Sequence, residues 1–163
     1  MSIVLEGGCL CGAIRYRIDA VILNTGICHC ETCRRAAGAQ SVAWLTVPAS
    51  GFRFDIGRPA IFASSPGVER THCPTCGTSL TYRSEADMID VTIGSLDDPE
   101  AVPPTQEIWL EHRLTWEAID PYRSTWQRSS AEQSTVLSVR ELRVPMVRPS
   151  WLPCSKTYQV TRC

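Results

Sequence analysis

Seven of the nine cysteines fall into three short clusters whose spacing suits metal binding. The clusters are Cys9-x-Cys11, Cys28-x-Cys30-x-x-Cys33 and Cys73-x-x-Cys76. Spacings this short are rare unless a metal ion gathers the sulfurs, and thiolate ligands make zinc the first hypothesis. The clusters divide into a site of four thiolates and a site of three, and a zinc ion with three protein ligands keeps a coordination position free for chemistry. Function is therefore expected around Cys28, Cys30 and Cys33.

The segment 73–77, CPTCG, has the pattern of a zinc knuckle. Two thiolates grip one ion, the proline fixes a backbone angle, and Gly77 permits a left-handed turn. Cys9 and Cys11 offer the second pair, and because this pair lies about sixty positions from Cys73, a shared ion would tie distant segments together. Such an ion is structural and supplies on the order of 10 kcal/mol of folding energy. Four buried, metal-free cysteines are the alternative.

The middle cluster, CHCETCR, contains three thiolates and a histidine. His29 is a possible fourth ligand, but a side chain between Cys28 and Cys30 points away from both in an extended segment. We therefore expect His29 to make hydrogen bonds or to line a pocket, and a merely packed or exposed imidazole stays open. A single two-metal cluster of all seven thiolates would need a bridging sulfur.

The elements that must position these cysteines are predicted to be strands. Ile14, Tyr16 and Ile18 alternate with two arginines, which is typical of a half-buried strand. The same period of two appears at 42–46, 52–54 and 89–93, and proline and glycine interrupt these runs at short intervals. The prediction is a mainly β domain, a small zinc-stapled sheet built from hairpins. One short helix is expected over 31–37, ending at Gly38.

The 163 residues are 44% hydrophobic, enough for one ordinary domain with its own core. We expect this domain to span residues 1–129 and to be followed by a loosely ordered tail over 130–163, with one possible strand at 136–144. The tail contains Cys154 and Cys163, to which the spacing assigns no role. We predict no secretion signal and no membrane span, hence a cytoplasmic location, where metal-bound thiolates are favoured over disulfides.

Charge argues against a nucleic-acid partner. Residues 1–129 hold 11 Arg and no Lys against 15 Asp plus Glu, whereas residues 130–163 hold five basic and two acidic side chains. An acidic body does not provide the basic surface that nucleic acids require. The tail's charges are scattered rather than gathered into a patch. The sequence gives no indication of oligomeric state.

Six motifs in order resemble the glutathione-dependent formaldehyde-activating enzymes, a family of small zinc proteins with centromere-associated relatives. They are GGCLCGAIRY, CHCETCRRAAGAQ, the GRP step at 57–59, HCPTCGTSL, VTIGSLDDPE and EIWLEHRLTWEAID, and they span roughly residues 3–126. The resemblance implies a structural zinc on Cys9, Cys11, Cys73 and Cys76 and a reactive zinc on Cys28, Cys30 and Cys33. It also implies a β fold shared with zinc-binding accessory proteins of small GTPases.

The resemblance gives Arg34 and Arg35 a possible role. They follow the three-cysteine cluster directly, and a guanidinium beside an open zinc would hold a carboxylate of bound glutathione. An exposed cationic helix face is the alternative. Together with His29, they are the candidate cofactor-binding residues. Trp109 and Trp116 are expected to pack in the core or at its rim.

Two functions from different classes follow. The first is a carbon–sulfur lyase, similar to S-(hydroxymethyl)glutathione synthase, which joins a glutathione-like thiol to formaldehyde or another small aldehyde, with two zinc ions per chain. The second is a non-catalytic thiol carrier or protein-interaction module, since fold and zinc content alone do not separate the two. A redox sensor that uses the three thiols stays a minor alternative if zinc proves absent. An unfilled zinc position favours the enzyme.

Overall fold

A computed structural model describes residues 3–84 and 87–128. The predicted tail over 130–163, with its possible strand at 136–144, lies outside the described residues. So do Cys154 and Cys163. The boundary drawn at residue 129 therefore stays a prediction.

The described chain is mainly β, as predicted. Its strands are β1 (Ile3–Gly8), β2 (Arg15–Ala20), β3 (Asn24–Cys28), β4 (Val42–Pro48), β5 (Phe52–Ile56), β6 (Ala60–Ser65), β7 (Val68–His72), β8 (Ser79–Arg83), β9 (Met88–Thr92), β10 (Gln106–Ile108) and β11 (Ser124–Thr125). Its helices are α1 (Glu31–Ala37) and the short 3-10 turns η1 (Ala49–Gly51), η2 (Ile93–Ser95), η3 (Pro99–Ala101) and η4 (Leu110–His112).

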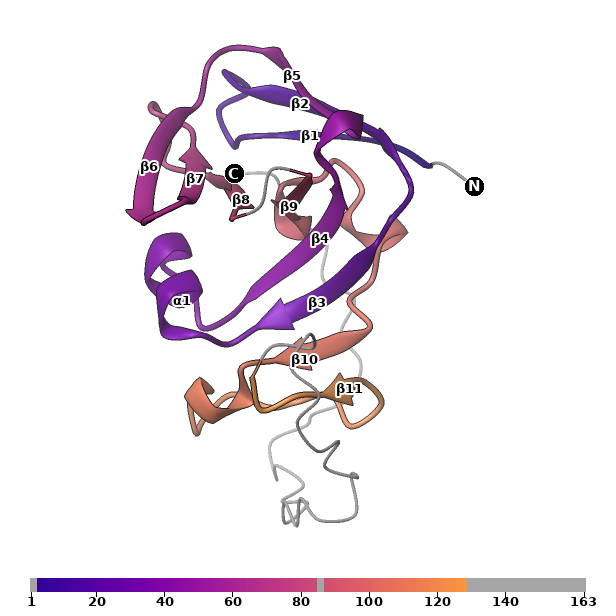
Figure 1. The fold of residues 1–163 in the computed structure, drawn as a ribbon, viewed down its shortest axis with the longest axis vertical. Helices are drawn as coiled ribbons and strands as arrows, with labels where there is room; N and C mark the ends of the chain where they lie inside the picture. Colours follow the sequence, from indigo (N-terminus) through magenta and orange to yellow (C-terminus); the bar gives the residue numbers. More distant parts are fainter. Residues whose placement is uncertain (1–2, 85–86, 129–163) are drawn as a thin grey trace, which may run out of the picture.

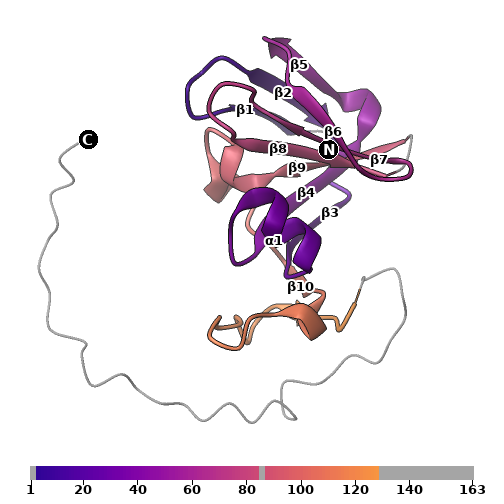
Figure 2. The same ribbon diagram turned by 90° about the vertical axis from the view of Figure 1, so that its left-hand side faces the viewer.

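The strands form two sheets. A small sheet has the order β1-β2-β5, and a large one has the order β11-β10-β3-β4-β9-β8-β7-β6. Figures 1 and 2 show the small sheet at one end of the molecule and β10 at the opposite end, with β3 and β4 between them. Neighbouring strands are antiparallel except at β3-β10 and β10-β11, which pair in parallel. Hairpins alone do not build these two pairings, nor the β4-β9 and β2-β5 pairings, which join strands that are not consecutive in the chain.

The main core lies between the two sheets. Tyr16 and Ile18 of β2 are almost fully buried and belong to the same apolar cluster as Leu45, Leu80 and Val91 of the large sheet. The alternation predicted for 14–18 is therefore confirmed, because the apolar residues of that run face inward while Arg15 and Arg17 stay partly exposed. Apolar burial of this kind is the main favourable term in folding.

Strand β4 is buried on both faces. Leu45 and Val47 belong to the main core, whereas Val42 and Trp44 belong to a second cluster that includes Cys28 and is packed against by other cysteines. Successive strand residues point to opposite faces, so the large sheet has a core face and a cysteine face. The three-cysteine cluster lies on the second face.

The helix α1 begins and ends where the sequence predicts. Cys30 is its N-cap and accepts a hydrogen bond from the Cys33 amide at 3.3 Å. Gly38 ends it in a left-handed conformation with φ 63°, which costs little for a residue without a side chain. Within 3–84 and 87–128, no helix has the length and apolar character needed to cross a bilayer.

Two glycines with positive φ provide a matched test of how tightly the small sheet packs on the loop around the first cysteine pair. Gly57 has φ 73°, and a Cβ there would lie 2.1 Å from the Ala13 carbonyl oxygen. Gly67 has φ 75° but would meet nothing within 4 Å. We expect Gly67→Ala to cost about 1–2 kcal/mol from its backbone conformation, and Gly57→Ala to cost about 1–3 kcal/mol more from overpacking.

The measurement is urea-induced unfolding of the two variants beside the wild type, all carrying metal. Equal destabilisation by the two substitutions would contradict the close packing of residue 57 against residue 13.

Candidate metal centres

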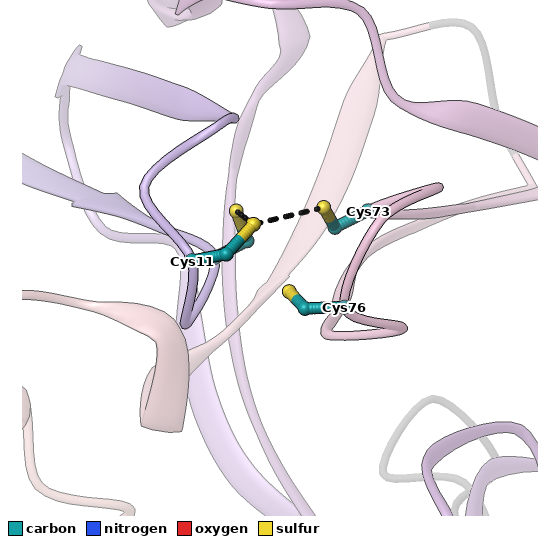
Figure 3. A group of neighbouring side chains, drawn as sticks. Cys11, Cys73 and Cys76 are labelled. Atoms are coloured by element: carbon teal, nitrogen blue, oxygen red, sulfur yellow. Dashed lines mark hydrogen bonds between the residues drawn. The ribbon is translucent and has the colours of Figure 1, made fainter.

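The first and last cysteine pairs meet at one point. Cys9 and Cys11 lie in the loop between β1 and β2, and Cys73 and Cys76 lie in the loop between β7 and β8. The four sulfurs lie within 4.8 Å of one another. The Cys11 and Cys73 sulfurs are 3.7 Å apart, and Figure 3 shows the side chains of the two loops pointing toward each other. The two pairs therefore form one group that could hold a metal ion, as the sequence predicts.

The spacing of these sulfurs fits a tetrahedral metal ion. A zinc–sulfur bond of about 2.3 Å places neighbouring thiolates about 3.8 Å apart. The Cys9–Cys11 distance is 3.5 Å, and none of the described cysteines forms a disulfide. The turn residues support the arrangement, because Gly12 and Gly77 both adopt φ 77°, and the Gly77 amide donates to the Cys73 carbonyl at 2.9 Å. The Ile14 amide donates to the Cys9 sulfur at 3.2 Å.

The thiols of this group do not ionise alike. Hydrogen bonding from Thr78 lowers the pKa of Cys76 to about 5. The Ala13 amide lowers the pKa of Cys11, but its contact with the Cys9 thiol and its partial desolvation outweigh this and raise that pKa to about 12. Burial raises the pKa of Cys9, but hydrogen bonds from the Ile14 amide and from neighbouring thiols outweigh it and leave that pKa lowered. Cys11 is therefore the thiol whose ionisation is resisted. A divalent cation removes that resistance.

The middle cluster forms a separate group of three. Cys28 ends β3, Cys30 caps α1 and Cys33 lies in the first turn of that helix, and their sulfurs also lie within 4.8 Å of one another. Hydrogen bonds from the Cys28 and Cys33 thiols lower the pKa of Cys30 to about 2. The hydrogen bond with Cys30 raises the pKa of the Cys28 thiol most strongly, and burial raises it further. This donor set also suits a divalent, thiolate-binding ion.

A cavity of about 600 Å³ opens at the three-cysteine site, and all three cysteines line it. Along the wall of the cavity, one row of residues that pair between neighbouring strands crosses the large sheet. Asn24 pairs with Thr46, Thr46 with Asp90, Asp90 with Tyr82, and Tyr82 with Arg70, so five strands contribute one residue each. Thr46 donates to Asp90 at 2.5 Å. The sequence alone does not single out Thr46, Tyr82, Asp90 and Arg70, because only the strand register brings them together.

His29 lies behind the three-cysteine site rather than in the cavity. Its Nε2 is 2.8 Å from Glu107 and its Nδ1 is 3.1 Å from Glu117, and all three side chains are buried. The expectation that it points away from Cys28 and Cys30 and makes hydrogen bonds is confirmed. It is not among the residues that line the cavity, so its assignment as a cofactor-binding residue stays a prediction without support from its position. The roles of the two glutamates were missed.

Arg34 and Arg35 also lie away from the cavity lining. The Arg34 side chain donates to the His29 carbonyl at 3.2 Å, and the exposed Arg35 pairs with Glu31 at 2.7 Å on the helix surface. Their assignment to glutathione binding stays a prediction. The alternative, an exposed cationic helix face, fits Arg35, whose side chain is exposed on the helix.

The two tryptophans of the last motif behave differently from each other. Trp109 is half-buried, lines the cavity and packs against the second apolar cluster. It has φ 62°, the one non-glycine residue with positive φ among those described, and such backbone strain is found most often at functional sites. Its ring stacks on His112 with a centroid distance of 5.7 Å. Trp116 is 68% exposed, so of the two expected positions, the core or its rim, the core does not apply to it.

Comparison with protein families places this site in a known context. A family model described as "glutathione-dependent formaldehyde-activating enzyme" matches residues 4–112, which contain all seven clustered cysteines. The chain belongs to this family. The match ends before the sixth motif is complete, so the resemblance expected up to about residue 126 is shown as far as 112.

The individual relatives match smaller parts of the chain than the family model does. An uncharacterised lyase from Schizosaccharomyces pombe is 34% identical to this chain over 79 residues. The match covers 47% of this chain and 56% of that protein, so the chain spans little more than half of the relative's length. A crystal structure of a Rhodobacter sphaeroides protein has 24% identity and a TM-score of 0.49, covering 61% of this chain and 92% of the other.

The four-cysteine group is expected to be structural in this family member. Replacing Cys73, which is fully buried, removes a ligand that joins two distant loops. We expect Cys73→Ser to unfold or aggregate, because a metal site of this kind supplies on the order of 10 kcal/mol. Cys30→Ser is the matched variant in the other group and should keep the fold while losing one of two bound ions.

Circular dichroism, thermal unfolding and elemental analysis of both variants make the test. A Cys30→Ser protein that unfolds as readily as Cys73→Ser would contradict the assignment of the two groups.

The buried carboxylate behind the site provides a stability test. Burial raises the pKa of Glu107, but hydrogen bonds from His29, the Asp120 amide and Arg123 outweigh it, so the pKa lies below the ordinary value. We expect Glu107→Gln to cost about 1.5–3 kcal/mol at neutral pH, the range for hydrogen bonds to charged groups. Because the ionised form is favoured in the folded state, this contribution is present above the ordinary carboxyl pKa and is lost as the pH falls through the lowered one.

The measurement is chemical unfolding of wild type and Glu107→Gln from neutral to acidic pH. Glu6→Gln, at an exposed ion pair with Arg17, is the control and should cost less than about 1 kcal/mol. A difference that stays constant down to the lowest pH would argue against an ionised Glu107.

Proposed function

We propose that the chain is a zinc-dependent carbon–sulfur lyase that joins a glutathione-like thiol to formaldehyde or another small aldehyde, and also catalyses the reverse reaction. Family membership and the lyase name of the fission-yeast relative support the reaction class. The two cysteine groups support metal dependence. A reducing compartment such as the cytoplasm would keep these cysteines free to bind zinc.

The observation that carries the proposal is the difference between the two cysteine groups. The first has four ligands and is coordinatively closed when metal is bound, whereas the second has three and borders a cavity. Structural zinc sites have four protein ligands, and catalytic ones have three and an open position. A volume of about 600 Å³ lies within the range of small-molecule sites and leaves room for a thiol of tripeptide size.

The reaction forms one carbon–sulfur bond. The thiol loses its proton, the sulfur attacks the aldehyde carbon, and the electron pair of the carbonyl π bond takes up a proton, which gives an S-hydroxyalkyl product. Zinc, when bound, would favour the thiolate and polarise the aldehyde oxygen. Cys28, Cys30 and Cys33 would hold the ion.

The cavity wall supplies the rest of the catalysis. Trp44, Tyr82 and Trp109 border the cavity with aromatic rings, and the first two rings pack with centroids 6.3 Å apart. A fixed wall of this kind holds two reactants in one orientation and makes their reaction effectively unimolecular. Because a three-thiolate ion is electron-rich and a modest Lewis acid, we assign most of the rate enhancement to this positioning.

The test is exchange NMR of glutathione and formaldehyde with zinc-loaded protein, which measures the rate of S-(hydroxymethyl)glutathione formation above the spontaneous rate. We expect acceleration by the wild type and none by Cys30→Ser, with one zinc ion retained by the variant instead of two.

Glutathione binding without acceleration would show a thiol carrier instead of an enzyme. Wild-type protein with fewer than two zinc ions after purification under reducing conditions would contradict the metal assignment.

A further inference from the structure

Arg70 of β7 is fixed beside the three-cysteine site. It is 7% exposed, although it carries a permanent charge. Its Nη2 donates to the Cys33 sulfur at 3.7 Å, its Nε donates to Ser64 at 3.3 Å, and its guanidinium lies 4.6 Å from the centre of the Tyr82 ring. These contacts hold the planar group at the edge of the metal site.

One end of this guanidinium has no partner. Nη1 of Arg70 is buried and makes no hydrogen bond within the part of the chain that the structure describes. A buried donor on a charged group is costly to leave unpaired, so a ligand that brings an acceptor is favoured. The planar fork of a guanidinium matches the two oxygens of a carboxylate.

Arg70 supplies the permanent positive charge in the wall of the cavity. Among the described lining residues, it is the one Arg or Lys. The acidic lining residues are already engaged, since Glu31 pairs with Arg35 and Asp90 accepts from Thr46. An anion that enters the cavity therefore meets one fixed positive charge, next to Cys33.

We propose that Arg70 binds a carboxylate of the substrate beside the three-cysteine site. The proposal rests on the function proposed above and narrows its substrate class. Formaldehyde has no carboxylate, so with formaldehyde the anion belongs to the thiol. The other source is an aldehyde that itself bears a carboxylate, such as glyoxylate, whose acid group lies one bond from the reacting carbon.

The experiment is calorimetric titration of the zinc-loaded, full-length protein with ligands that differ only in their carboxylates. One arm compares glutathione with its diester, and the other compares glyoxylate with its ethyl ester. The proteins are wild type, Arg70→Lys, which keeps the charge but loses the fork, and Arg58→Lys as the control. Arg58 is exposed and does not line the cavity.

We expect esterification to weaken binding to wild type by about tenfold or more in one arm, the size of a charge-assisted hydrogen bond. That arm identifies the source of the carboxylate. Arg70→Lys should weaken binding of the free acid in that arm by a similar factor and leave binding of the ester unchanged. Its zinc content should equal that of the wild type, and Arg58→Lys should bind each ligand as the wild type does.

Equal binding of acid and ester by wild type in both arms would overturn the proposal, and this comparison needs no variant. Arg70→Lys protein that loses affinity for acid and ester alike would overturn it as well, because Arg70 would then support the metal site only. If neither glutathione nor its diester binds to the zinc-loaded wild type, the proposed function is overturned as well. That result differs from equal binding of acid and ester, so the two failures are distinguishable.

Discussion

The convergence of two loops on four cysteines is the constraint on which the cavity depends. Cys11 and Cys73 are 62 positions apart, and an ion shared by the four cysteines would join the small sheet to one end of β7. Closing so long a loop costs conformational entropy, which metal binding would offset. Arg70 lies on β7 three positions before Cys73, so an ion bound by this loop would also help to fix where the guanidinium meets Cys33. The four-cysteine group would thereby help to position Arg70 beside the three-cysteine group.

Local patterns predicted the elements, and long-range pairing decided the site. The alternation at 14–18 and the glycine at 38 were sufficient for β2 and for the end of α1. The parallel pairing of β3 with β10 joins Cys28 to Ile108, 80 positions away, and no periodicity encodes such a pairing. Likewise, nothing in the local sequence distinguishes Arg70 from the other arginines of the chain. Its importance follows from register, which places it beside Tyr82.

Helix geometry explains why the arginines nearest in sequence lie outside the cavity. Each residue of an α-helix is rotated by about 100° from the one before it. Cys33 faces the site, so Arg34 turns toward the His29 carbonyl and Arg35 turns to the exposed side, where it pairs with Glu31. Adjacency in sequence is therefore a poor guide to adjacency in a helical site, whereas a residue 37 positions away contacts Cys33 directly.

The charge of the metal site gives the guanidinium two roles. Three thiolates around a divalent cation carry a net charge of about −1, by the ionisation that metal binding requires. One edge of Arg70, at Nη2, offsets part of this charge through Cys33, while Nη1 stays unpaired. In a partly buried site, a remaining positive group attracts an anion more strongly than it would in water. With an ion bound, the same residue would balance part of the charge of the metal site and, as proposed above, would bind a carboxylate of the substrate.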